Sequence, residues 1–202
     1  MSHDAEQATA RERILGVAGD LFAEGGFDAV SVADIASASG ISTGLIYYHF
    51  KDKQTLFETV VRESIHLLED AAVVSLSGET GPEVRLTSFV TAYMKLLEEH
   101  ESLMRLLIRS MSDLGSPLPR HVLMRSAAIV ERLQAVIEEG IASGVFRAVD
   151  ARLAATALFA LINTLITARV LDTPLGEHGG ADIEAQASFM SDLFMGGIRS
   201  CS

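Results

Sequence analysis

The sequence predicts an all-α fold of about nine helices, with an N-terminal group of three helices followed by a larger helical part. Apolar residues recur at helical spacing along nearly all of the 202 residues. There are only 4 prolines, and most of the 16 glycines stand at the ends of the periodic segments. Because 49 % of the residues are apolar, the chain can bury a large core and does not have the composition of a disordered protein.

The first helix is expected at residues 10–24, where apolar positions from Ile14 to Phe22 form one stripe. Thr9 precedes this stripe and is the expected N-cap. The glycine pair at positions 25 and 26 should end the helix, because glycine readily adopts the left-handed conformation found at helix C-termini.

A second and a third short helix follow. Ser31 and the aspartate three residues later resemble a capping box, which predicts a helix at residues 32–39. Gly40 supplies a turn, and a third helix should run from Ser42 to about Phe50.

Three small or aliphatic residues indicate how these two helices meet. Ala36, Gly40 and Ile46 have the spacing of a helix-turn-helix, in which a small residue allows close crossing and an aliphatic residue packs between the helices. By itself this spacing fits an ordinary helical hairpin equally well.

Six more helices are predicted in the rest of the chain. We therefore expect two domains, at residues 8–54 and 55–202. Residues 77–82 form the clearest break between helices, and Asp150 and Asp182 stand where N-caps belong. The six helices are expected at residues 52–76, 83–99, 102–113, 119–143, 150–171 and 182–199.

Cysteine content and hydropathy indicate a cytoplasmic protein. Cys201 is the single cysteine, so an internal disulfide is excluded and a reducing compartment fits. The charged N-terminus does not resemble a signal peptide. The longest uncharged run, residues 153–168, is too short to cross a membrane core of about 30 Å as a helix, so no membrane partner is expected.

The sequence contains none of three common catalytic motifs, G-x-x-x-x-G-K, G-x-S-x-G and H-E-x-x-H. Its six histidines show no metal-ligand spacing. Residues 98–101 could hold a metal ion, but they fit a solvated helix end better. We therefore expect neither an enzyme nor a cofactor.

The net charge of -11 argues against loose binding to nucleic acid. Between Ser31 and Lys53, however, two lysines balance two aspartates, so this segment is neutral within an acidic chain. A helical protein-binding module therefore remains an alternative to a DNA-binding protein, and a salt-dependent DNA affinity would separate the two.

Residues 11–61 resemble the N-terminal part of the tetracycline-repressor (TetR) family of bacterial transcription regulators. The resemblance rests on the sequence ILGVAGDLFAEGGFDAVSVADIASASGISTGLIYYHFKDKQTLF, and the run from Leu45 to Phe50 followed by Lys53 is its most specific part. It implies that the third helix enters the DNA major groove. The residues expected to contact DNA are Ser31, Ser42, Thr43, Gly44, Tyr47, Tyr48, His49 and Lys53.

The resemblance implies a homodimer, and the C-terminal helices fit this expectation. The helix at 150–171 is apolar on nearly all sides, so it should be buried both by its own chain and by a partner. As in similar proteins, this helix and the last one should form a four-helix interface with their partners. The predicted interface residues are Leu158, Leu161, Leu165, Met190 and Phe194.

Methionines and aromatic residues in the middle helices suit an adaptable apolar pocket, although each could equally belong to an ordinary core. The predicted pocket residues are Phe89, Tyr93, Met94, Met104, Ile108, Met111, Met124, Asn163 and Thr167. Arg105, Arg109 and Arg125 could meet an anionic ligand or pair with acidic neighbours. With the resemblance, these features predict a repressor that a small apolar or amphipathic effector releases from a palindromic operator.

Overall fold

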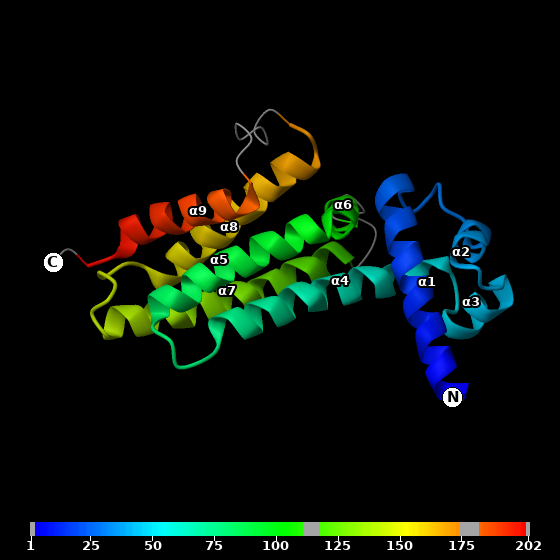
Figure 1. The fold of residues 1–202 in the computed structure, drawn as a ribbon, viewed down its shortest axis with the longest axis horizontal. Helices are drawn as coiled ribbons and strands as arrows, with labels where there is room; N and C mark the ends of the chain where they lie inside the picture. The colour runs from blue at the N-terminus through cyan, green and yellow to red at the C-terminus, as the bar shows by residue number, and fades with distance from the viewer. Residues whose placement is uncertain (1–2, 111–117, 174–181, 201–202) are drawn as a thin grey trace. The chain divides into compact units, whose positions relative to one another are not determined.

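The computed structural model describes residues 3–110, 118–173 and 182–200, and these residues form nine α-helices and no strand. The all-α prediction is therefore confirmed, and Figure 1 shows the order of the helices. Their bounds are α1 His3–Gly25, α2 Val32–Ser39, α3 Thr43–His49, α4 Lys53–Leu76, α5 Pro82–Glu99, α6 Glu101–Ser110, α7 Leu118–Ala142, α8 Ala151–Val170 and α9 Ile183–Ile198.

Most predicted helix bounds agree with the structure to within one residue, but the start of the first helix was predicted wrongly. Helix α1 already begins at His3, so Thr9 lies inside the helix and is not its N-cap. Ser31, Ser42, Asp150 and Asp182 do cap their helices, each with a side-chain oxygen that accepts a backbone N–H.

The chain divides into two compact units, Met1–Ile65 with Ser102–Arg120, and His66–Glu101 with His121–Ser202. The boundary between them falls inside α4. The sequence-based domain boundary between residues 54 and 55 stays a prediction.

In the first unit, α1 packs against both α2 and α3. Ile14, Ile35 and Ile46, one from each helix, are almost completely buried. The rings of Phe22 and Phe57 meet edge to face, with centroids 5.1 Å apart, so the start of α4 joins the same core. Burial of one side of α3 leaves its other side for solvent or a partner.

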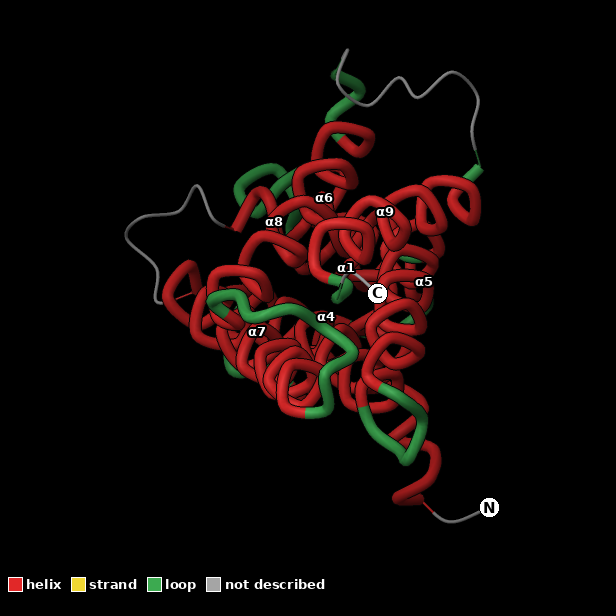
Figure 2. The backbone as a smooth tube through the Cα atoms, turned by 90° about the vertical axis from the view of Figure 1, so that its left-hand side faces the viewer, coloured by secondary structure: helices red, strands yellow, loops and turns green. Residues whose placement is uncertain are grey.

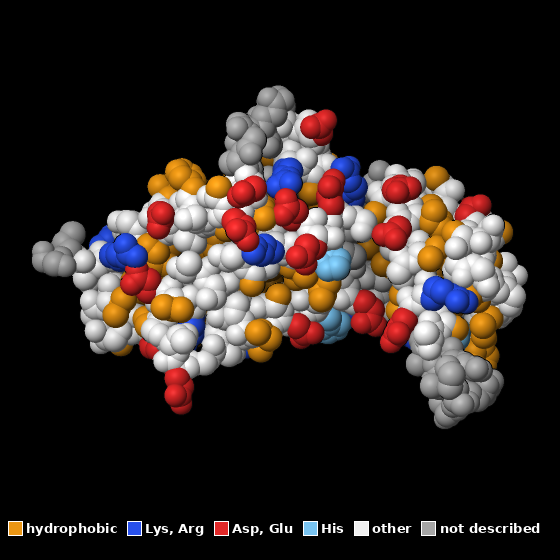
Figure 3. Space-filling model, viewed as in Figure 1, with side chains coloured by type: hydrophobic (Ala, Val, Ile, Leu, Met, Phe, Trp, Pro, Cys, Tyr) orange, Lys and Arg blue, Asp and Glu red, His pale blue; other side chains and the backbone are white. Residues whose placement is uncertain are grey.

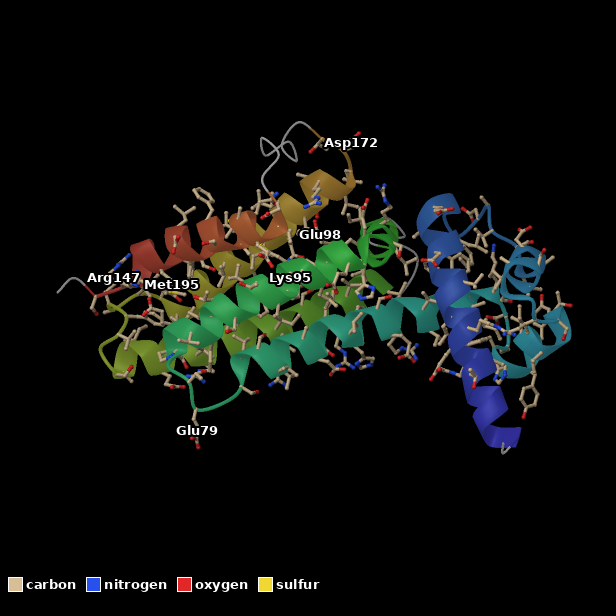
Figure 4. All side chains as sticks on the ribbon, viewed as in Figure 1. Glu79, Lys95, Glu98, Arg147, Asp172 and Met195 are labelled. Atoms are coloured by element: carbon tan, nitrogen blue, oxygen red, sulfur yellow. The ribbon has the colours of Figure 1, made fainter. Side chains whose placement is uncertain are left out.

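In the second unit, α5 packs against α9 and α8, and Figure 2 shows these helices from the end of the bundle. The stacked rings of Phe89 and Tyr93 lie 5.1 Å apart, and Phe159 of α8 lies 5.9 Å from Tyr93. Ion pairs also join these helices, among them Lys95 with Glu184 of α9 and Glu98 with Arg169 of α8, and Figure 4 labels Lys95 and Glu98 on α5.

Among the described helices, α8 is the one that is long and apolar enough to cross a membrane, with a mean hydropathy of 1.7. Core helices of water-soluble proteins also pass this test of length and composition. About 33 % of its apolar window is buried inside the structure, so an apolar surface stays exposed along the helix.

Candidate nucleic-acid interface

Two reciprocal hydrogen bonds begin α2. The backbone N–H of Asp34 donates to the Ser31 hydroxyl oxygen over 3.1 Å, and the N–H of Ser31 donates to the Asp34 carboxylate over 2.8 Å. Hydrogen bonds from the Ser31 side chain and backbone lower the pKa of Asp34 below its ordinary value. Ser31 is exposed, but its hydroxyl already donates to Asp34 over 2.6 Å.

The turn between α2 and α3 depends on Gly40, which has a φ of 66°. This left-handed conformation is easy for glycine and costly for most other residues. The next residue, Ile41, is buried and donates its N–H to the carbonyl of Ala36 over 3.1 Å. The turn therefore sets the angle at which α3 leaves α2.

Helix α3 presents five of its predicted DNA contacts to solvent. Ser42, Thr43 and Gly44 at its N-terminal end are exposed, and Tyr47 and Tyr48 are 54 % and 67 % exposed. Ile46, on the opposite side, is 1 % exposed and anchors the helix. The outer side therefore offers hydroxyl and phenol groups around a glycine that lets another molecule approach the backbone closely.

His49 is less available than the tyrosines. Its side chain is half-buried, and its Nε2 atom is enclosed without a hydrogen-bond partner in the described part of the chain. Its ring lies edge-on to that of Tyr48, with centroids 5.2 Å apart.

The ammonium group of Lys53 is bound within the protein, unlike that of a lysine that reaches out to a phosphate. Its ammonium donates to the carbonyl oxygens of Phe27 and Val30 over 2.8 and 3.1 Å, and it lies 4.2 Å from the centre of the Phe27 ring. Lys51, two residues earlier, is exposed and was not predicted as a contact. The sequence feature that could have indicated a DNA contact at Lys51 was its position between the third and fourth helices.

Both acidic residues of this segment accept backbone N–H groups at the start of a helix. Asp34 accepts the N–H of Ser31, the N-cap of α2, and Asp52 accepts the N–H of Thr55 over 2.7 Å at the start of α4. Hydrogen bonds with Thr55 lower the pKa of Asp52 below its ordinary value. Each carboxylate therefore lies against backbone N–H groups, and Lys51 remains as an exposed cation next to α3.

The predicted pocket residues differ in their burial. Phe89, Tyr93 and Met94 fill the core of the second unit and are at most 2 % exposed. Met124 lies on the surface, with 65 % of its area exposed, and its pocket role stays a prediction. Met104 is buried and Ile108 half-buried in the first unit, and Met111 lies outside the described residues. Arg125 pairs with Glu69 over 2.9 Å.

An open hollow of about 480 Å³ does lie along α8, and it includes the predicted Asn163 and Thr167. Phe159 and Leu171 give it an apolar wall, and Thr164 and Thr173 add hydroxyl groups. The residues that line it in the described part of the chain are all uncharged. The arrangement suits an uncharged molecule with an apolar body and one or two hydrogen-bonding groups.

Asn163 joins this hollow to the buried core. Its side-chain amide donates to the carbonyl of Phe159 over 2.8 Å, and the side chain also acts on the buried phenol of Tyr93. Burial raises the pKa of Tyr93 well above its ordinary value, so this phenol stays neutral.

The predicted dimer residues differ in their exposure. Leu158 and Met190 are buried within their own chain, Leu165 and Phe194 are half-buried, and Leu161 is 44 % exposed. Exposed apolar side chains lie on both helices, and Figure 3 shows apolar side chains at the surface along α9. The exposed large apolar side chains are Leu153 and Leu161 on α8, Leu171 at its C-cap, and Phe189 and Leu193 on α9.

Both the N-terminal and the C-terminal part of the chain resemble known proteins. The family model described as bacterial regulatory proteins, tetR family, matches residues 14–60. The model of the tetracyclin repressor-like C-terminal domain matches residues 79–167. The HTH-type transcriptional repressor KstR2 of Mycolicibacterium smegmatis is 30 % identical over 145 residues, which cover 71 % of this chain and 70 % of that protein.

Solved structures have the same fold over nearly the whole chain. The regulator PfmR of Thermus thermophilus is 29 % identical, with a TM-score of 0.75 over 91 % of this chain and 97 % of that one. A transcriptional regulator from Saccharomonospora viridis, crystallised with choline, is 27 % identical, with a TM-score of 0.79 over 96 % and 100 % of the two chains.

Proposed function

The chain belongs to the tetR family of bacterial regulatory proteins, and we propose that it represses transcription by binding a palindromic operator as a homodimer until a small effector releases it. The family consists of DNA-binding transcriptional regulators, so this chain is a regulator and not an enzyme. We place it in the cytoplasm, where a bacterial operator is found. The observation that carries the proposal is the exposed polar face of α3 opposite its buried Ile46.

The exposed groups of α3 suit a mixture of base and backbone contacts. Thr43 offers a hydroxyl to base edges and a methyl group to thymine, and Tyr47 and Tyr48 can donate to phosphate. Helix α3 has no arginine, so the common bidentate contact to guanine is absent from it. We therefore expect DNA shape to contribute to operator choice.

Pairing of two copies would supply the affinity that one neutral reading helix lacks. The exposed apolar side chains of α8 and α9 support a four-helix interface made by these helices and their partners. Two recognition helices held at a fixed separation would then match a palindromic site.

The hollow along α8 supports an uncharged effector. Its apolar wall and its amide and hydroxyl groups suit a molecule with an apolar body and a carbonyl or hydroxyl group. Choline, the cation found with the regulator of Saccharomonospora viridis, is a less suitable class for the uncharged groups that line this hollow among the described residues.

Selection of DNA by the protein tests the operator proposal. The wild-type protein should enrich a palindromic duplex from a randomised library, and its affinity for that duplex should fall with salt. A Tyr48→Ala variant should fold normally, because Tyr48 is exposed, and should bind the duplex more weakly. Failure of the wild-type protein to enrich any duplex would contradict the proposal.

A thermal-shift screen of uncharged amphipathic compounds tests the effector proposal. A compound that stabilises the wild-type protein should act less on an Asn163→Leu variant and should lower the affinity for the selected duplex. A compound that binds at Asn163 and leaves this affinity unchanged would show that the hollow does not control DNA binding.

A further inference from the structure

Lys53 makes contacts that connect distant parts of the first unit. It is the first residue of α4, yet its ammonium donates to the carbonyls of Phe27 and Val30, which lie 26 and 23 residues earlier in the chain. The same ammonium lies 4.2 Å from the centre of the Phe27 ring. Charge-assisted hydrogen bonds and a cation–π contact together make this a strong attachment for a single side chain.

These contacts close the segment that carries the helix-turn-helix. Val30 directly precedes Ser31, the N-cap of α2, and Lys53 directly follows the connection that leaves α3. Everything between them, from the cap of α2 to the end of α3, is therefore held at both ends by one side chain. A small movement at either end would turn the exposed face of α3.

The ammonium of Lys53 has little capacity left for DNA. A lysine ammonium has three donors, and two of them already bind carbonyl oxygens. The side chain is half-buried, and the Phe27 ring covers part of the ammonium. Lys51 differs in each respect that matters here, since its side chain is exposed and lies in the connection between α3 and α4.

We propose that Lys53 is a positioning residue that holds α2 and α3 in their DNA-reading arrangement, while Lys51 supplies the phosphate contact at this end of α3. The inference rests on the proposed DNA binding. It assigns different roles to two lysines that stand two residues apart and carry the same charge.

The salt dependence of DNA binding distinguishes these roles. A lysine that neutralises a phosphate contributes about 0.9 to the slope of log affinity against log salt concentration, whereas a lysine that acts only through protein geometry contributes nothing. Lys51→Met and Lys53→Met are a matched pair, because both remove one positive charge and keep an unbranched side chain. The probe is the duplex that the wild-type protein selects from the randomised library.

Lys51→Met should reduce the slope by about 0.9 for each bound copy of the chain. Lys53→Met should weaken binding by about tenfold or more with the slope unchanged, because the remaining phosphate contacts are the same but α3 is misaligned. Both variants are measured at a temperature where circular dichroism shows the wild-type helical content, so that partial unfolding does not imitate weak binding.

Three results would overturn the inference. A reduced slope for Lys53→Met would make it a phosphate contact, and an unchanged affinity would make its carbonyl bonds irrelevant to DNA reading. An unchanged slope for Lys51→Met would remove its proposed role. A wild-type protein that selects no duplex would overturn the DNA-binding proposal itself, which is a different result from any difference between the two variants.

Discussion

Gly140, near the end of α7, is a residue whose identity is set by one neighbour. A Cβ atom at this position would lie 2.0 Å from the ring of Phe146, which is itself 2 % exposed. The backbone N–H of Phe146 also donates to the carbonyl of Gly140 over 3.0 Å, so the ring cannot easily move away. The next segment of chain is therefore held against α7 only because position 140 has no side chain.

We predict that Gly140→Ala lowers the free energy of unfolding by about 1–3 kcal/mol, the usual cost of forcing an extra carbon into a packed site. Urea denaturation measures this change. Gly16→Ala is the control, because Gly16 lies in an exposed part of α1 with no atom within 4 Å of the added carbon. That change should stabilise the protein by about 0.5–1 kcal/mol. A Gly140→Ala variant as stable as the wild type would contradict the predicted clash.

Single residues also show what the sequence could not predict. The caps Ser31, Ser42, Asp150 and Asp182 were predictable, because a cap depends on a few neighbouring residues. Lys53 was assigned to phosphate from its place at a helix start, whereas carbonyl groups 23 and 26 residues away decide where its ammonium lies. Contacts of that sequence separation leave no local pattern.

At the scale of helices, the apolar periodicity of the sequence predicted the helix bounds well, but it did not predict which side of each helix is buried. The helix bounds followed from apolar spacing and caps, whereas burial of a second side of α8 by a partner stays a prediction. The period alone could not separate core from surface, and so Met124 was placed in a pocket although it is 65 % exposed. Which side of α8 faces α5 depends on packing between helices that are far apart in the sequence.

The buried phenol of Tyr93 on α5 and the side chain of Asn163 on α8 interact, and we expect this polar contact between the two helices to contribute to stability. Tyr93→Phe should lower the free energy of unfolding by about 1–2 kcal/mol, since the buried phenol loses its interaction with Asn163. Denaturation of Tyr93→Phe, Asn163→Leu and the double variant measures their coupling, which should exceed about 0.5 kcal/mol. Additive effects of the two changes would show that the two side chains do not act on one another.

The same pair gives a pH dependence with a definite sign. The folded pKa of Tyr93 is raised above its ordinary value of 10.0, so above that pH the unfolded chain releases the proton while the folded chain keeps it. Stability that is complete below this pH must fall as pH rises. Tyr93→Phe should therefore lose less stability than the wild type between about pH 9 and 11.

For the whole molecule, several large apolar side chains of α8 and α9 are exposed in the single chain, where a partner could cover them. The sequence predicted pairing through these two helices, and the structure supplies the residues through which we propose that it occurs. Leu161 on α8 and Leu193 on α9 are 44 % and 57 % exposed, whereas the predicted Leu158 and Met190 face their own core.

We predict that Leu161→Glu together with Leu193→Glu converts a dimer into monomers, because a charge buried between two apolar surfaces has no partner there. Size-exclusion chromatography with light scattering should show a mass near 21.6 kDa in place of twice that value. Val74→Glu is the control, since Val74 is 78 % exposed on α4 and should leave the dimer intact. The monomeric variant should bind the selected duplex about 100-fold more weakly or worse, because two linked reading helices no longer engage one site. A wild-type protein that is monomeric at micromolar concentration, or a double variant that stays dimeric, would place the pairing surface elsewhere or remove it.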